Sequence, residues 1–165
     1  MTGLVDPDVF RSAVGRLPAG VAVVALTWRG TQHAMTASAV ASVSLDPPLL
    51  LFCVHADARV RDALDDVNTW AVSILSDQQG PTADWLSSPG RPAFGQLDRV
   101  PHHAAPVSGG AWLDGASAWF DCRTEAIHAA GDHDIVVGAV LAARQGPADA
   151  GGLVHLRGRV HPVRG

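Results

Sequence analysis

Short apolar runs rich in β-branched residues recur along the chain and predict a mainly β protein with short helices. Glycine, proline and small polar residues separate most of these runs. The predicted strands are residues 21–28, 33–45, 49–54, 70–75, 116–128, 134–144 and 153–160. Many strands with few helices between them favour an antiparallel barrel over a parallel α/β sheet.

Three segments have the features of short helices. Asp6 followed by Pro7 is a favourable helix start, because an aspartate caps the first turn and proline fits its first position. Apolar residues follow at helical spacing as far as Leu17. Residues 57–64 and 77–86 predict two further helices.

Residues 87–110 are rich in proline, glycine, serine and histidine. We interpret this segment as a long surface excursion rather than a linker, because the strands after it need the earlier strands to pair with. The chain is therefore predicted to form a single domain over residues 1–165.

The composition argues against some classes of partner. A net charge of −4 and a pI near 6.0 disfavour nucleic acid and anionic membranes. The N-terminus lacks signal-peptide features, and no apolar run approaches the ~20 residues of a spanning helix, so we expect a cytoplasmic protein. Cys53 and Cys122 lie in apolar segments and are predicted to be buried free thiols.

Residues 36–44 alternate in a way that predicts one hydroxyl-lined strand face. The even positions are Thr36, Ser38, Val40, Ser42 and Ser44. The odd positions are small and apolar, which lets a backbone approach a flat ligand. Such a strand fits the donors and acceptors along the pyrimidine edge of a flavin. It also fits a half-exposed strand with its polar face in water, and taken alone it favours that second interpretation.

The segment 54–61 joins a predicted strand to a predicted helix. Amides at a helix start bind phosphate, and Arg59 or Arg61 would add positive charge. On its own, however, the segment favours an ordinary helix start that Asp57 caps, with both arginines in water.

Gly131, Asp132 and His133 stand directly before an apolar run at residues 135–140. A histidine at the mouth of a buried strand can orient a nicotinamide or manage a proton, so His133 is the candidate catalytic residue. The alternative is a structural histidine whose ring is fixed by Asp132 or Asp134. The histidine spacing matches no zinc site, and the sequence contains no P-loop or Rossmann glycine motif.

Together these residues resemble the flavin reductase-like family, the small NAD(P)H:flavin oxidoreductases that serve two-component monooxygenases. The similarity covers nearly the whole chain in the family's order. It includes Met35-Thr36-Ala37-Ser38, which resembles the family's flavin-binding strand, and the Gly131-Asp132-His133 segment. The other similar segments lie in residues 10–24, 42–49, 114–122 and 156–159.

The resemblance implies a split β-barrel of the Greek-key, FMN-binding type, forming a homodimer with flavin near the subunit interface. The implied flavin-lining residues are Thr36, Ala37, Ser38 and Ser42. The implied phosphate-binding residues are Ala58, Arg59 and Val60, where the family often has serine and threonine. The resemblance also places Phe94 at the border of the pocket and His133 beside the nicotinamide.

The activity implied by the resemblance is hydride transfer from NADH or NADPH to FMN or FAD. Reduced flavin would then pass to a partner monooxygenase. The sequence leaves open an alternative, in which a non-catalytic flavin- or haem-binding protein uses the same barrel as a sensor or carrier.

Overall fold

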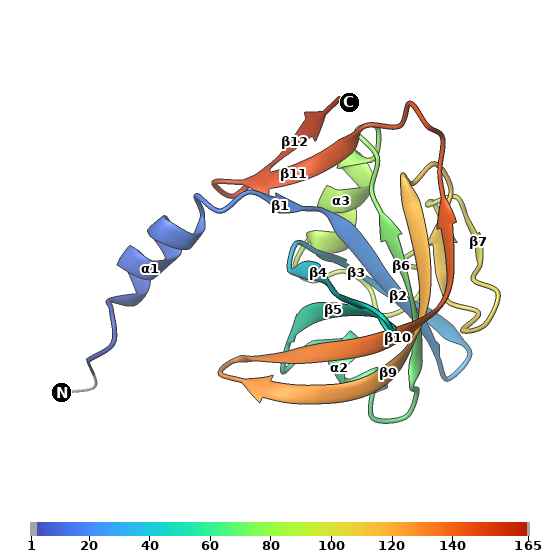
Figure 1. The fold of residues 1–165 in the computed structure, drawn as a ribbon, viewed down its shortest axis with the longest axis horizontal. Coiled ribbons are helices and arrows are strands. Elements are labelled where there is room, and N and C mark those ends of the chain that lie inside the picture. The colour runs from blue at the N-terminus through green and yellow to red at the C-terminus, as the bar shows by residue number, and fades with distance from the viewer. Residues whose placement is uncertain (1–2, 165) are drawn as a thin grey trace.

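A seven-stranded antiparallel sheet forms the body of the molecule (Figure 1). The computed structural model describes residues 3–164, and within them this sheet has the strand order β3-β2-β6-β9-β10-β5-β4. Its strands are β2 (Ala22–Trp28), β3 (Thr31–Ala37), β4 (Val40–Leu45), β5 (Pro48–His55), β6 (Thr69–Ile74), β9 (Ala118–Ala130) and β10 (His133–Gln145). The predicted mainly β fold with short helices is confirmed.

The strands β3 and β4 follow each other in the chain but lie at opposite edges of the sheet. The sheet therefore curls until Ser38 and Ala39 connect its two edges. The Cys53 amide holds this connection on β5 by donating to the Ala39 carbonyl oxygen at 2.9 Å. Among the described residues no ladder pairs β3 with β4, which fits a split barrel. The predicted single strand over residues 33–45 is wrong, because the chain leaves one edge at Ser38 and rejoins the sheet at the other.

Two smaller sheets accompany the large one. The strands β1 (Ala19–Gly20), β11 (Gly152–Leu156) and β12 (Arg159–Val163) form one, and β7 (His102–Ala104) pairs with β8 (Ala111–Leu113) in the other. The predicted single strand over residues 153–160 is wrong. The chain turns at Arg157 and Gly158, whose φ angles are 52° and 74°, and returns antiparallel as β12.

The first helix, α1 (Pro7–Val14), stands clear of the barrel (Figure 1). It begins as predicted, because the Asp6 carboxylate accepts hydrogen bonds from two first-turn amides at 2.9 and 3.2 Å. The helix ends at Val14 with Gly15 as its C-cap, before the predicted end at Leu17. None of its side chains is buried within this chain, so apolar residues such as Phe10 face solvent.

The other helices, α2 (Arg59–Ala63) and α3 (Gly80–Ser87), fall at the predicted segments. The expected cap by Asp57 is wrong, since Ala58 occupies the cap position of α2 and no side chain bonds there. Within residues 3–164, every helix is too short or too polar to cross a bilayer.

Apolar side chains fill the interior of the barrel. Phe52 and Trp70 are fully buried there, with ring centroids 4.8 Å apart in an edge-to-face arrangement. Both cysteines are free, as predicted, but only Cys122 is buried, whereas Cys53 is half-buried. Gly138 lies directly against Trp70, because a Cβ at this position would come within 2.4 Å of the indole.

The excursion over residues 87–110 is packed against the barrel rather than confined to the surface. Leu97 and Val100 from this segment are buried in a second core cluster, together with Leu75 and Leu113. The prediction of a surface excursion is therefore wrong for these positions.

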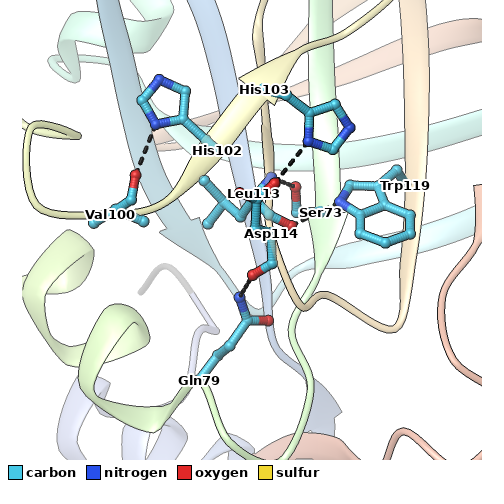
Figure 2. Close-up of polar contacts among 8 residues, drawn as sticks. All are labelled: Ser73, Gln79, Val100, His102, His103, Leu113, Asp114 and Trp119. Atoms are coloured by element: carbon cyan, nitrogen blue, oxygen red, sulfur yellow. Dashed lines mark hydrogen bonds and ion pairs between the residues drawn. The ribbon is translucent and has the colours of Figure 1, made fainter.

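Figure 2 shows the polar contacts that hold the β7–β8 hairpin on the large sheet. The Nδ1 atom of His103 lies 2.7 Å from Oδ1 of Asp114. The Leu113 amide donates to the buried Ser73 hydroxyl at 2.9 Å, and the Trp119 indole donates to the Leu113 carbonyl oxygen at 2.8 Å. These bonds tie the hairpin to β6 and β9, so the cluster anchors the excursion.

Candidate functional site

Two adjoining cavities lie where β3, α3 and the start of α2 meet. The first, the arginine pocket, has a volume of about 770 Å³, and the second, the hydroxyl pocket, of about 500 Å³. The arginine pocket is lined by residues that include His33, His55, Ala58, Arg59, Val60, Ser87 and Arg91. The hydroxyl pocket is lined by residues that include Thr36, Ser38, Ser87, His155 and Arg159. Since Ser87 lines both, the two cavities adjoin there, and we call the pair the groove; each has a volume in the range of small-ligand sites.

The structure separates the hydroxyl-bearing residues of the predicted flavin-lining set, with some in this groove and one on the exposed surface. Thr36 and Ser38 line the hydroxyl pocket, and the Thr36 hydroxyl donates to the Ala83 carbonyl oxygen at 2.8 Å. The Ala37 side chain is buried in the core, and Ser42 is exposed on the edge strand β4, lining neither pocket. The hydroxyl face is interrupted because the strand breaks at Ser38 and its register shifts after Ser42.

Positive charge gathers in the arginine pocket. The predicted phosphate segment lines it through Ala58, Arg59 and Val60, and Arg91 reaches it from the excursion. Burial, and then the positive charge of Arg59, lower the pKa of the Arg91 guanidinium. The same two causes lower the pKa of His33. The pocket therefore favours an anionic ligand.

The catalytic candidate His133 lies beside the arginine pocket rather than in its wall. On β10 it pairs with His55 of β5, and the two rings form an edge-to-face pair with centroids 5.2 Å apart. Its Nδ1 atom is 2.7 Å from Oδ1 of Asp132. This hydrogen bond, followed by the charge of His133, lowers the pKa of Asp132. His55, the ring partner of His133, is itself a lining residue of the pocket.

The contacts of these two imidazoles favour opposite tautomers when both rings are neutral. The Asp132 carboxylate can only accept, so Nδ1 of His133 bears the hydrogen and Nε2 is an acceptor. The Asp57 amide donates to Nδ1 of His55 at 3.1 Å, so the hydrogen of His55 is on Nε2. The pair thus offers one accepting and one donating nitrogen at the mouth of the strand, which suits a site that holds a proton.

The two arginines considered for phosphate binding have different surroundings. Arg59 lines the arginine pocket. Arg61 instead donates through Nε to Asp134 and through Nη1 to Asp65 at 2.7 Å, and these hydrogen bonds raise its pKa. Arg61 is therefore a structural anchor between α2 and β10, and it does not line the arginine pocket.

Phe94 stands on the excursion close to the arginine pocket without lining it. Its side chain is 73% exposed, whereas Arg91 and Gln96 on either side line the pocket. An aromatic ring this exposed is available to contact a bound ligand or a second subunit.

Three residues of the arginine pocket are not predicted from the sequence. The sequence could have indicated His55 as a pocket residue, because it directly precedes the segment considered for phosphate binding. His33 and Arg91 belong to no motif. They meet only because the excursion folds onto β3, where the Arg91 guanidinium donates to the Ala34 carbonyl oxygen at 3.2 Å.

The chain matches the family model of the flavin reductase like domain over residues 14–164. It is similar to the flavin reductase (NADH) of Kitasatospora aureofaciens. The two sequences are 39% identical over 156 residues, which cover 94% of this chain and 81% of that protein.

Solved structures share the same architecture. BorF, the flavin reductase component of a bacterial two-component tryptophan halogenase, superposes with a TM-score of 0.90 at 34% identity, covering 97% of this chain and 99% of BorF. SgcE6, the NADH:FAD oxidoreductase of Streptomyces globisporus C-1027 solved with NAD and FAD fragments, superposes with a TM-score of 0.87 at 34% identity. That match covers 97% of this chain and 96% of SgcE6.

Proposed function

The chain belongs to the flavin reductase-like family, and from this premise we propose that it is an NAD(P)H-dependent flavin reductase acting on FMN or FAD. The observation that supports this most strongly is that the hydroxyl and arginine pockets adjoin at Ser87. A flavin nucleotide has a polar ring edge and an anionic phosphate. The groove offers hydroxyls in one half and positive charge in the other.

We assign the ligand-binding residues from their place along this groove. Thr36 and Ser38 would bind the polar edge of the flavin, with Ala37 contributing through its backbone. Ala58, Arg59 and Val60 would bind the phosphate. Ser42 and Phe94 would meet the ligand from outside the two pockets.

The chemistry is divided between the ligands and the chain. When bound, a flavin would supply the hydride acceptor and a dihydronicotinamide the hydride. The chain would hold both rings in register, because alignment of reacting groups removes much of the entropic barrier. His133, fixed by Asp132 with Nε2 as acceptor, would orient the nicotinamide amide or manage a proton.

We further propose that reduced flavin passes to a partner monooxygenase. BorF is the flavin reductase component of a two-component enzyme, and this similarity supports a second protein that uses the reduced flavin. The similar flavin reductase of Kitasatospora aureofaciens and SgcE6 both use NADH, which supports NADH as the hydride donor. A single domain over residues 1–165 would act in the cytoplasm, where thiols such as Cys53 and Cys122 stay reduced.

A spectrophotometric assay tests the activity. Purified protein with NADH or NADPH and free FMN or FAD should remove the reduced-nicotinamide absorbance. We expect His133→Ala to slow flavin reduction by about 100-fold in stopped-flow experiments, because a positioned acid–base or orienting group is lost. Flavin affinity should change little, since His133 does not line the pockets.

The matched control is His128→Ala, which removes an exposed histidine from the neighbouring strand β9. This variant should reduce flavin at the wild-type rate. Unchanged reduction by His133→Ala would remove His133 from the catalytic residues. Failure of the wild-type protein to consume either nicotinamide with either flavin would refute the reductase proposal itself.

We also propose a homodimer in which α1 packs on a second copy of the chain. Helix α1 buries none of its own side chains, and Phe10 and Leu17 are 58% and 66% exposed. A cavity of about 830 Å³ lies between α1 and the β11–β12 turn, and Ser38 lines both this cavity and the hydroxyl pocket. A partner seated there would complete the flavin site.

A further inference from the structure

Two arginines with no carboxylate partner face the arginine pocket. Among the described residues, neither Arg59 nor Arg91 has an acidic oxygen within ion-pairing distance. Asp57 also lines the pocket, but its side chain is 93% exposed and its ion-pair contact is with His55 at 4.0 Å. Two like charges that share one cavity repel each other, so the arrangement favours an anion between them.

Arg91 is held in place for this role by backbone contacts. It donates through Nη1 to the Ser88 carbonyl oxygen at 2.9 Å and through Nη2 to the Ala34 carbonyl oxygen at 3.2 Å. Its Nε atom is buried and has no hydrogen-bond partner among the described residues. A fixed, partly desolvated guanidinium loses little conformational freedom when it binds a phosphate.

A second polar group in the wall is also unsatisfied. His33 is only 6% exposed, and its Nδ1 atom has no hydrogen-bond partner among residues 3–164. Buried polar atoms in native proteins are nearly always paired, so an unpaired one at the wall of a cavity indicates a missing ligand or water. His33 comes from β3, Arg59 from α2 and Arg91 from the excursion, so three separate elements present these groups to the same space.

The size of the pocket indicates more than a single phosphate. Its volume of about 770 Å³ lies in the range of cavities that enclose whole drug-sized ligands. It adjoins the hydroxyl pocket at Ser87, so a ligand held in one can extend into the other. A nucleoside diphosphate joined to a redox-active ring matches this combination of charge, volume and connection.

We propose that the arginine pocket binds the adenosine diphosphate part of a dinucleotide and that Arg91 is the residue that selects dinucleotides over mononucleotides. If the dinucleotide is FAD, Arg59 serves the phosphate that FMN and FAD share and Arg91 serves the additional one; if it is NADH, Arg91 serves the NADH diphosphate. The diphosphate belongs either to FAD or to NADH, which carry the same chemical group. The identity of these two ligands rests on the proposed function.

The test compares the wild-type protein with Arg91→Gln. Dissociation constants for FAD, FMN and riboflavin are measured by calorimetry, and KM is measured for NADH and for reduced nicotinamide mononucleotide with riboflavin as acceptor. If FAD is the source, Arg91→Gln should raise the FAD to FMN ratio of dissociation constants about tenfold. If NADH is the source, the KM for NADH divided by the KM for reduced nicotinamide mononucleotide should rise by a similar factor.

Two further variants control the test. Arg99→Gln makes the same charge change on an exposed position of the same excursion and should leave both ratios unaltered. Arg91→Lys keeps the charge and should recover part of the loss, which separates an electrostatic role from a folding defect. Equal weakening of FAD, FMN and riboflavin by Arg91→Gln would indicate a structural residue and overturn the proposal. Unchanged values of both ratios would overturn it as well.

Riboflavin separates this inference from the reductase proposal. It carries no phosphate, so wild-type oxidation of NADH with riboflavin tests reduction alone. If the wild-type protein oxidises NADH with riboflavin but Arg91→Gln leaves both ratios unaltered, the reductase proposal stands and the proposed role of Arg91 is refuted. If the wild-type protein lacks that activity but Arg91→Gln still changes the FAD to FMN ratio, the reductase proposal is refuted and the role of Arg91 stands.

Discussion

The Cys122 thiol lies in an unusual electrostatic setting. It is buried next to Asp121, a fully buried carboxylate that accepts hydrogen bonds from the Val107 amide at 2.6 Å and the Ser108 amide at 3.1 Å. Burial, followed by the charge of Asp121, raises the pKa of the Cys122 thiol to about 12. The chain contains neither lysine nor tyrosine, the residue types whose side chains would otherwise ionise in the same alkaline range.

This composition makes an alkaline loss of stability traceable to one residue. The unfolded chain releases the Cys122 proton near pH 9, whereas the folded chain keeps it up to about 12. The free energy of unfolding should therefore fall as the pH rises above 9, by up to ~1.4 kcal/mol per pH unit. Urea denaturation under reducing conditions measures the slope. Cys122→Ala should remove most of it, and a variant with the wild-type slope would contradict the assignment.

At the scale of elements, the ion pair between Arg61 and Asp134 joins α2 to the strand that bears His133. Both side chains are largely buried, at 21% and 12% exposed. Arg61→Leu would leave the Asp134 carboxylate buried without its cation, and we expect the free energy of unfolding to fall by about 3 kcal/mol. Chemical denaturation of the purified variant measures this loss.

A double variant and a surface pair are the controls for this prediction. Arg61→Leu combined with Asp134→Leu should lose less stability than Arg61→Leu alone, because no unpaired charge stays buried. The pair of Arg123 and Glu125 is 50% and 43% exposed, so Arg123→Leu should cost less than about 1 kcal/mol. Equal losses of unfolding free energy for Arg61→Leu and Arg123→Leu would show that burial does not determine how much these ion pairs contribute to stability.

The elements that the sequence predicts well are those specified by local pattern. The apolar runs of β2 and β6 mark buried strands, because both faces of these strands meet core or neighbouring elements, whereas β5 alternates between buried and half-buried residues. The break at Ser38 escapes prediction, since neither glycine nor proline marks it, whereas the break at Arg157 has a local signal in Gly158 that the prediction of a single strand did not use. Where the strand ends at the first of these breaks depends on distant pairing partners, which local pattern does not contain.

The same division applies to the candidate site. Arg59 and His133 belong to short segments with recognisable composition, and both lie at or beside the arginine pocket. Arg61 has nearly the same sequence context as Arg59, but the chain brings Asp134 against it from 73 residues away. Arg91 and His33 come together only through the packing of the excursion on β3. Contacts between distant segments, rather than motifs, therefore decide which cations line the arginine pocket.

At the scale of the whole molecule, α1 is the element that the single chain leaves without a partner. A helix of eight residues is only marginally stable in water, and its apolar face gains nothing from solvent. The rest of the chain encloses its own core, whereas α1 extends away from it (Figure 1). A second copy of the chain would supply the missing surface most simply, because an isologous contact would bury both copies of α1 at once.

Light scattering coupled to size exclusion tests this dimer. We expect the wild-type protein to have twice the chain mass of 17.1 kDa at micromolar concentration. Phe10→Asp places a charge on the exposed apolar face of α1 and should shift the population to monomer, whereas Leu141→Asp, which alters a side chain 39% exposed on β10, should not. The monomeric variant should also bind flavin more weakly, because Ser38 borders both the α1 cavity and the hydroxyl pocket. A wild-type mass of one chain across the concentration range would show instead that α1 stays in solvent and that the flavin site is complete within a single copy.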